Sequence, residues 1–295
     1  MRKTAILMAV TMMACSHLVP ERVDYRGEMI KFVSAIRSYA RARRPDFLVI
    51  GQNGLELVSP AYLAAIDGVG QESLHFSHAI KGRATGAEHR EFLYGVLGRV
   101  KAARKRVLIT DYVETPEQAK ESARLNQAAG FEGFAATSRE LDNVPGKAGA
   151  FLYLIDPGKF PDKAAYLAAL VAADHAMLII DVSFDGSAPL SPEEVARLKK
   201  NGRPVLAYLS IGEAETYRPY WDPRWKQMPP SWLAEENPDW DGNIKVRYWQ
   251  EAWQKIIFGS PEAALDKIIA AGFDGVYLDI IDAFSYFEAE RASSS

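Results

Sequence analysis

Short apolar segments alternate with longer amphipathic ones along most of this chain. A continuous apolar run of four or five residues is typical of a parallel strand that is buried on both faces. Eight such strands are predicted, at residues 47–50, 66–70, 107–110, 134–137, 151–155, 177–180, 205–209 and 276–278. Their alternation with helices predicts an α/β fold, most economically a closed (β/α)8 TIM barrel. An open, doubly wound sheet is the main alternative, although no glycine-rich phosphate-binding fingerprint follows any strand.

Helical periodicity and capping residues separate these strands. In the first helical segment, which starts at Asp24, apolar residues recur three or four positions apart. Thr115 and Ser191 each stand before a proline and a glutamate, a composition typical of a helix N-terminus. Further helices are predicted at residues 59–65, 88–104 and 163–172 and from residue 261. An insertion at 217–253 is rich in aromatic residues, most of which we expect to form a hydrophobic lid, with one or two touching a substrate.

The start of the chain has the pattern of a secretory signal. The predicted domains are a signal peptide at 1–22, a single barrel at 23–291 and a disordered tail at 292–295. A positively charged start precedes an apolar run at 4–14, which is too short to span a bilayer. Cys15 follows Ala14 in a pattern similar to a bacterial lipoprotein cleavage site. We therefore expect lipidation of Cys15, and the alternative is an ordinary signal peptide cut near Ala14.

Composition and charge exclude several classes of partner. The chain has 295 residues, a net charge of −3 and a pI near 6.0, so it has no overall basic signature for binding nucleic acid. Basic residues at 37–44 precede Pro45 and are interpreted as a solvated helix C-terminus that complements the helix dipole. Cys15 is the only cysteine, so no intrachain disulfide can form. We expect a monomer that needs no cofactor.

Candidate catalytic residues stand at the ends of the predicted strands, where the active site of a TIM barrel forms. Asp181, Glu213 and Asp279 follow apolar runs. The other polar strand-end residues are Gln52, Asn53, Glu72, Asp111, Tyr112, Thr137 and Asp156. Glycoside hydrolysis needs one carboxyl group to protonate the leaving oxygen and another to attack the anomeric carbon or activate water. Helix capping could explain any single acid, but acids at three strand ends favour a catalytic function.

Other site chemistries fit the sequence less well. The five histidines lie away from the strand ends and have no ligand-like spacing, which argues against a zinc site and a hydroxyl–imidazole triad. Clustered carboxylates would also suit magnesium or calcium, but no segment resembles an EF-hand loop. We therefore predict that the protein has no metal site.

Several longer phrases resemble glycoside hydrolase family 114, which contains endo-α-1,4-polygalactosaminidases. The phrases are AYLSIGEAE at 207–215, PSWL at 230–233, NPDW at 237–240, YLDIIDA at 277–283, DFLVIGQNG at 46–54 and RELD at 139–142. The resemblance spans most of the chain after the predicted signal. In the family, the strand similar to 151–155 comes first, and the parts that match 24–142 come last. The chain therefore resembles a circularly permuted member.

The resemblance implies a (β/α)8 barrel and a retaining mechanism. By motif, Asp181 would be the nucleophile, Glu213 the acid/base and Asp279 a supporting carboxylate. The candidate substrate-binding residues are Gln52, Asn53, Asp111, Tyr112, Tyr208, Glu215, Trp249 and Asp282.

The resemblance also implies a substrate class. Characterised members act on galactosamine polymers, which are partly deacetylated and cationic, so an acidic rim would suit them. The predicted function is a secreted or lipid-anchored glycoside hydrolase that cleaves an α-linked amino-sugar exopolysaccharide. Its expected location is the bacterial periplasm or outer membrane, with an N-terminal lipid as the membrane attachment. A non-catalytic carbohydrate-binding or matrix-associated barrel is the alternative.

Overall fold

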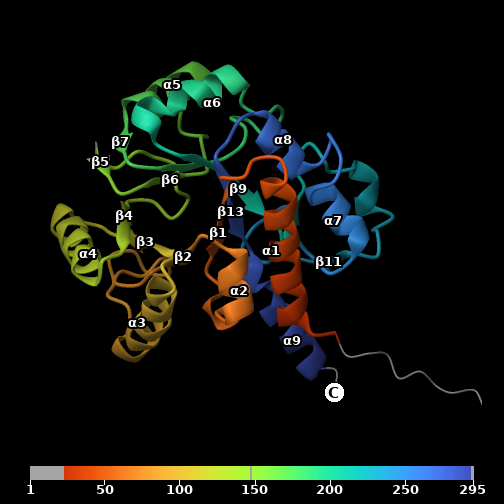
Figure 1. The fold of residues 1–295 in the computed structure, drawn as a ribbon, viewed down its shortest axis with the longest axis horizontal. Coiled ribbons are helices and arrows are strands. Elements are labelled where there is room, and N and C mark those ends of the chain that lie inside the picture. Colours follow the sequence, from red (N-terminus) through yellow and green to blue (C-terminus); the bar gives the residue numbers. More distant parts are fainter. Residues whose placement is uncertain (1–22, 147, 294–295) are drawn as a thin grey trace, which may run out of the picture.

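The computed structural model describes residues 23–293 except residue 147, so the predicted signal peptide and Cys15 lie outside the described residues. Eight parallel strands form one sheet in the order β4-β3-β2-β1-β13-β9-β8-β6. Their bounds are β1 Leu48–Gln52, β2 Gly68–Glu72, β3 Arg106–Tyr112, β4 Glu132–Ala136, β6 Leu152–Leu154, β8 Leu178–Ile180, β9 Val205–Ser210 and β13 Gly275–Asp279. Helices surround this nearly closed barrel (Figure 1). The predicted TIM barrel is confirmed, and each predicted strand overlaps a strand of the sheet.

The two edges of the sheet, β4 and β6, meet through side-chain packing. Phe134 of β4 and Phe151, which directly precedes β6, have ring centroids 5.6 Å apart. Just beyond the strands, the amide of Ile155 donates a hydrogen bond of 3.0 Å to the carbonyl of Leu141. These contacts bring the edges together and favour a barrel over an open sheet.

The helices begin largely where the sequence predicts. Their bounds are α1 Tyr25–Arg41, α2 Pro60–Ala65, α3 Ala87–Ala102, α4 Pro116–Ala129, α5 Lys163–Ala172, α6 Pro192–Leu198, α7 Glu251–Ile257, α8 Ala264–Ala270 and α9 Phe284–Ser293. Thr115 caps α4 by accepting a hydrogen bond from the Gln118 amide. Ser191 and Glu194 form a reciprocal capping box at the start of α6. Both predicted helix starts are therefore confirmed. In each helix, a side-chain oxygen of the capping residue accepts a hydrogen bond from a backbone amide of the first turn, which has no partner within the helix.

The insertion after β9 contains a small antiparallel sheet and a helix that the sequence pattern did not predict. The sheet has the order β10-β12-β11, with bounds β10 Glu213–Glu215, β11 Leu233–Glu236 and β12 Asn243–Val246. A chain of indole rings packs beneath it, with centroids 5.0–5.2 Å apart along Trp221, Trp225, Trp232 and Trp253. Most aromatic side chains of the insertion therefore form a hydrophobic layer, as expected.

Short elements complete the chain, and the described ends lie side by side. These elements are η1 Leu55–Leu57, β5 Ala148–Gly149, β7 Asp174–His175, η2 Lys200–Gly202, η3 Pro223–Lys226 and η4 Ile281–Ala283. Arg26 of α1 forms a 2.9 Å ion pair with Glu288 of α9. Arg291 donates a hydrogen bond to the carbonyl of Val23. The first and last helices consequently run next to each other on the outside of the barrel (Figure 1).

Glycine at position 70 makes room for a polar pair inside the barrel. The Tyr277 hydroxyl donates to Oε1 of Gln52 across β1 and β13. A Cβ atom at Gly70 would lie 1.8 Å from the Tyr277 hydroxyl and 2.4 Å from Gln52 Oε1. Both distances are far below van der Waals contact, so the pair depends on the missing side chain of β2.

Gly70→Ala should therefore destabilise the barrel. Overpacking of this kind costs about 1–3 kcal/mol, which corresponds to a fall in Tm of about 2–10 °C for a domain of this size. Thermal denaturation followed by circular dichroism measures the change. The matched control is Gly98→Ala on exposed α3, where a Cβ meets nothing within 4 Å and Tm should hold or rise slightly. An unchanged Tm for Gly70→Ala would show that the Tyr277–Gln52 pair can move aside.

Candidate active site

Two carboxyl groups, Glu72 at the end of β2 and Asp279 at the end of β13, lie at the mouth of the barrel. The Tyr112 hydroxyl and Nδ2 of Asn53 donate to Glu72, the latter over 3.1 Å. The Tyr208 hydroxyl donates to Asp279 over 2.8 Å. Both acids are half-buried, so they are enclosed but still reachable.

Strand register explains why these groups converge. On the paired strands β13 and β9, Tyr277 lies opposite Tyr208 and Asp279 lies opposite Ser210, so both tyrosines and Asp279 face the barrel interior. The Tyr153 and Tyr277 rings pack below the acids with centroids 5.0 Å apart. Tyrosines from several strands thus form a floor beneath the mouth and exclude water from below it.

The environment of Asp279 favours a protonated carboxyl group. Burial raises the pKa of Asp279 to about 7, and the nearby negative charge of Glu72 acts in the same direction, against the lowering effects of the Tyr208 hydroxyl and the Ile280 amide. Like charges in one enclosed site disfavour double ionisation. Asp279 can therefore carry a proton near neutral pH.

A second group of acids belongs to a buried ion-pair network beside the mouth. Asp181 and Glu215 are only 7% and 3% exposed and share the guanidinium of Arg218, at 2.7 and 2.6 Å. The amide of Ser183 also donates to Asp181, and the Tyr217 hydroxyl donates to Glu215. Burial by itself lowers the pKa of Arg218, but the two carboxylates outweigh it and raise the pKa well above its usual value. This network fastens the insertion to the end of β8.

Glu213 is fully buried and is held by the insertion that follows it. Lys245 on β12 forms a 3.0 Å ion pair with it. The side-chain amides of Asn237 and Asn243 donate to its two oxygens at 2.9 and 3.2 Å. All three partners come from the turn between β11 and β12 or from β12 itself, so Glu213 connects β10 to that hairpin.

The structure brings some of the other candidate residues to the mouth and places others elsewhere. Gln52, Asn53, Tyr112 and Tyr208 lie in the Glu72–Asp279 cluster. Asp282, in η4, lies close by, and burial raises its pKa. Trp249 packs between Tyr25 and Phe287, which makes its contacts those of a core residue.

Asp111 is not brought to the mouth. Successive side chains of a strand point to opposite faces, so Tyr112 points into the barrel and Asp111 points out toward the helices. His75 Nδ1 lies 2.7 Å from its carboxylate, and Ser122 and Asn126 of α4 donate to the same group. Burial opposes ionisation of Asp111, but the hydrogen bond from His75 and the other donors outweigh it and lower its pKa. Asp111 therefore links β3 to α4.

Glu72 is absent from the catalytic and binding sets that the sequence analysis selected. It follows a weak strand of alternating glycines, and Gln71 before it is polar, so no apolar run ends at it. Its position at a strand end was the only signal. Its nearness to Asp279 arises from the sheet order, in which β2 and β13 flank β1 and end at the same mouth.

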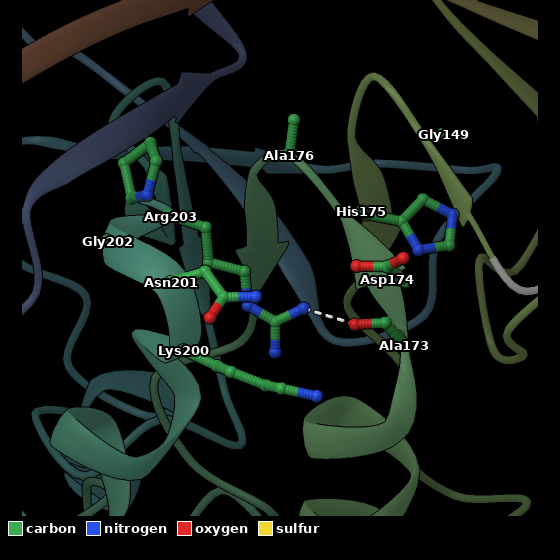
Figure 2. Close-up of a pocket in the computed structure, with 10 residues that line it drawn as sticks. Gly149, Ala173, Asp174, His175, Ala176, Lys200, Asn201, Gly202 and Arg203 are labelled. Carbon is green, nitrogen blue, oxygen red and sulfur yellow. Dashed lines mark hydrogen bonds between the residues drawn. The ribbon is translucent and has the colours of Figure 1, made fainter.

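A pocket of about 430 Å³ lies at the opposite end of the barrel (Figure 2). It is lined by residues that precede β8 and β9, including Asp174, His175 and Lys200. Arg203 in its wall donates to the carbonyls of Leu170, Ala173 and Leu198, which end α5 and α6. Active sites of TIM barrels form at the other end of the strands, so we interpret Arg203 as a structural cap for these helices.

Within 23–293 apart from residue 147, no group of three or more His, Cys, Asp or Glu residues is arranged to hold a metal ion. In the same part of the chain, none of the helices combines the length and apolarity needed to cross a membrane.

Residues 159–294 match the sequence model of glycoside-hydrolase family GH114. The match covers just under half of the chain and supports a glycoside hydrolase. It includes Asp181, Glu213, Arg218 and Asp279, whereas Glu72 lies outside it.

Three curated relatives match over a similar length of chain. An uncharacterized protein of Methanocaldococcus jannaschii is 50% identical over 117 residues, 39% of this chain and 33% of the relative. Uncharacterized proteins of Deinococcus radiodurans and Thermotoga maritima are 46% and 45% identical over 118 residues. Those matches cover 40% and 39% of this chain and 37% and 35% of the relatives. The chain thus spans about a third of the length of the relatives it matches.

Proposed function

We propose that this protein is a glycoside hydrolase whose catalytic pair is Glu72 and Asp279. The observation behind this proposal is that two half-buried carboxyl groups lie at the barrel mouth, and that burial and the charge of Glu72 raise the pKa of Asp279 to about 7. Asp181, Glu213 and Glu215, in contrast, are buried and have their oxygens occupied by Arg218, Lys245 and neighbouring amides and hydroxyls. The catalytic roles that the resemblance implies for Asp181 and Glu213 remain predictions, and the geometry favours the other pair.

The proposed chemistry needs one acid and one base in the same cleft. The protonated carboxyl group donates its proton to the glycosidic oxygen as the bond to the anomeric carbon breaks. The ionised carboxylate attacks that carbon, and water then releases the sugar with the first group acting as base, which gives a retaining reaction. The Tyr112 and Tyr208 hydroxyls hold the two carboxyl groups in place from the floor of the mouth.

We propose an α-linked amino-sugar polymer of the galactosamine type as the substrate. Several carboxylates surround the mouth, and a negative rim attracts a partly deacetylated, cationic chain. The test measures new reducing ends when the purified protein is incubated with partly deacetylated galactosamine polymer, with fully acetylated and neutral polymers in parallel. Turnover restricted to the neutral polymers would contradict the substrate, and binding without any turnover would favour the non-catalytic carbohydrate-binding alternative.

The raised pKa of Asp279 predicts an alkaline limit to activity. The pKa of Asp279 is raised to about 7 by burial and by Glu72, so kcat/KM should fall as pH rises through about 7 and Asp279 loses its proton. The Tyr208 hydroxyl stabilises the charged form of Asp279 and lowers its pKa. Tyr208→Phe should therefore move the alkaline limb to higher pH. The pH dependence of kcat/KM for both proteins measures this, and a limb that stays in place would assign the proton to another group.

We also propose export and a permuted chain order. Cys15 would carry the lipid of an envelope protein, which mass spectrometry of the membrane fraction tests directly.

The permuted chain order is supported by the described ends, which lie side by side, with Arg291 hydrogen-bonded to the carbonyl of Val23. A chain that joins these ends through a short linker and opens before residue 151 should fold to the same barrel.

A further inference from the structure

We propose that Trp240 forms a sugar-binding subsite over the mouth, separate from the cleavage site, and this inference rests on the proposed hydrolase function. Trp240 lies in the turn between β11 and β12 and is 44% exposed. The other indoles of the insertion discussed above are packed into its hydrophobic layer. The indole of Trp240 takes no part in that layer, and the part of its surface that Arg139 leaves exposed is available to a ligand.

The turn that contains Trp240 reaches across the barrel rim. The guanidinium of Arg139, in the loop after β4, lies 5.2 Å from the indole centroid. β9, from which the insertion starts, is separated from β4 by β8 and β6 around the barrel. The contact therefore connects the insertion to the loop after β4 on another side of the rim, and a polymer chain that enters the mouth must cross this rim.

The turn is held in a single shape by short-range hydrogen bonds. The Asn237 amide donates to the Asn243 carbonyl over 2.7 Å, and the Asn243 amide donates to the Trp240 carbonyl over 3.1 Å. The left-handed Gly242, with φ of 79°, donates to Glu236. A platform that is ordered before binding loses little conformational entropy when a ligand stacks on it.

Glu213 acts as the positioning residue for this platform. Asn237 and Asn243, at the two ends of the turn, both donate to its carboxylate. Glu213 stands on β10, which follows β9, and the β9 residue Tyr208 bonds Asp279. The orientation of Trp240 is thereby connected to the strand that supports the proposed catalytic pair.

The side chains around the platform fit a cationic sugar. The exposed face of the indole can pack against the C–H face of a sugar ring. Asp239 and Asp241, both exposed, flank Trp240 in the sequence and add negative charge beside it. A hexosamine unit of the polymer, with a free amino group, meets both requirements.

Trp240→Ala tests the subsite without touching the catalytic pair. We expect KM for the polymer to rise about tenfold, with kcat and the hydrolysis of a short activated aryl glycoside nearly unchanged. Trp240→Phe, which keeps an aromatic face, should recover part of the loss. The matched control is Met228→Ala in the same insertion, which removes another exposed side chain, 70% accessible, and should leave KM unchanged.

Binding measurements separate this inference from the proposed function. Affinity electrophoresis in gels containing the galactosamine polymer reports binding whether or not the protein cleaves it. If the parent protein binds but does not cleave, and Trp240→Ala loses binding, the subsite stands and the hydrolase proposal fails. If Trp240→Ala keeps the parent KM and binding, or loses kcat equally on the polymer and on the aryl glycoside, the subsite is refuted.

Discussion

Asp279→Asn and Glu72→Gln should each lower the turnover rate by about a hundredfold to ten-thousandfold, with little change in Tm. Each substitution keeps the side-chain shape and removes a group that can gain or lose the proton, and such proton transfers typically contribute 10²–10⁴-fold to rate. Removing the charge of a half-buried acid beside another acid also relieves repulsion, so the fold should be retained. Steady-state kinetics and thermal denaturation of the same preparations measure both effects.

The pattern across four variants decides between two assignments of the catalytic pair. Asp181→Asn and Glu213→Gln change buried, fully bonded carboxylates and should mainly lower Tm. If instead these two variants stop turnover at an unchanged Tm, and Asp279→Asn and Glu72→Gln remain active, the roles implied by the family resemblance are right. Added azide should give a glycosyl azide of inverted configuration with the variant that lacks the nucleophile, and one of retained configuration with the variant that lacks the acid/base group.

Arg218→Met is expected to cause the largest loss of stability, about 3–5 kcal/mol. The Arg218 side chain is 9% exposed and is bonded to Asp181 and Glu215, so its removal leaves two buried carboxylates without their counter-charge. Chemical denaturation measures the free energy of unfolding. Because Asp181 follows β8 and Glu215 lies on β10, we also expect faster proteolysis within the insertion than elsewhere.

An exposed ion pair in the same insertion provides the control for Arg218. Arg224 pairs with Asp222 at 2.5 Å, but its side chain is 79% exposed. Ion pairs in water are largely offset by solvation and side-chain entropy, so Arg224→Met should leave stability unchanged within error. If the two substitutions lowered the free energy of unfolding equally, the burial of the Arg218 ion pairs would not be the cause of their effect on stability.

Most of the barrel could be predicted because its determinants are local. The apolar runs at 177–180 and 205–209 became β8 and β9, since a strand buried on both faces requires an apolar side chain at nearly every position. Thr115 and Ser191 cap their helices as predicted, because the capping oxygen bonds an amide only three residues away. The small sheet of the insertion was missed, because pairing of β10 with β12 joins residues about thirty positions apart.

For the candidate site, the sequence determined less than the tertiary structure did. By itself, the sequence determined that acids stand at the ends of strands, because a strand end is a local feature of the pattern. Only the tertiary structure decided which acids meet. Side-chain direction on a strand alternates, which turned Asp111 toward α4 and Tyr112 toward the mouth. The sheet order placed Glu72 and Asp279 on the two strands that flank β1, and the insertion placed Arg218 and Lys245 against Asp181 and Glu213. Such electrostatic pairing depends on distances between segments far apart in the chain, and a one-dimensional pattern does not contain those distances.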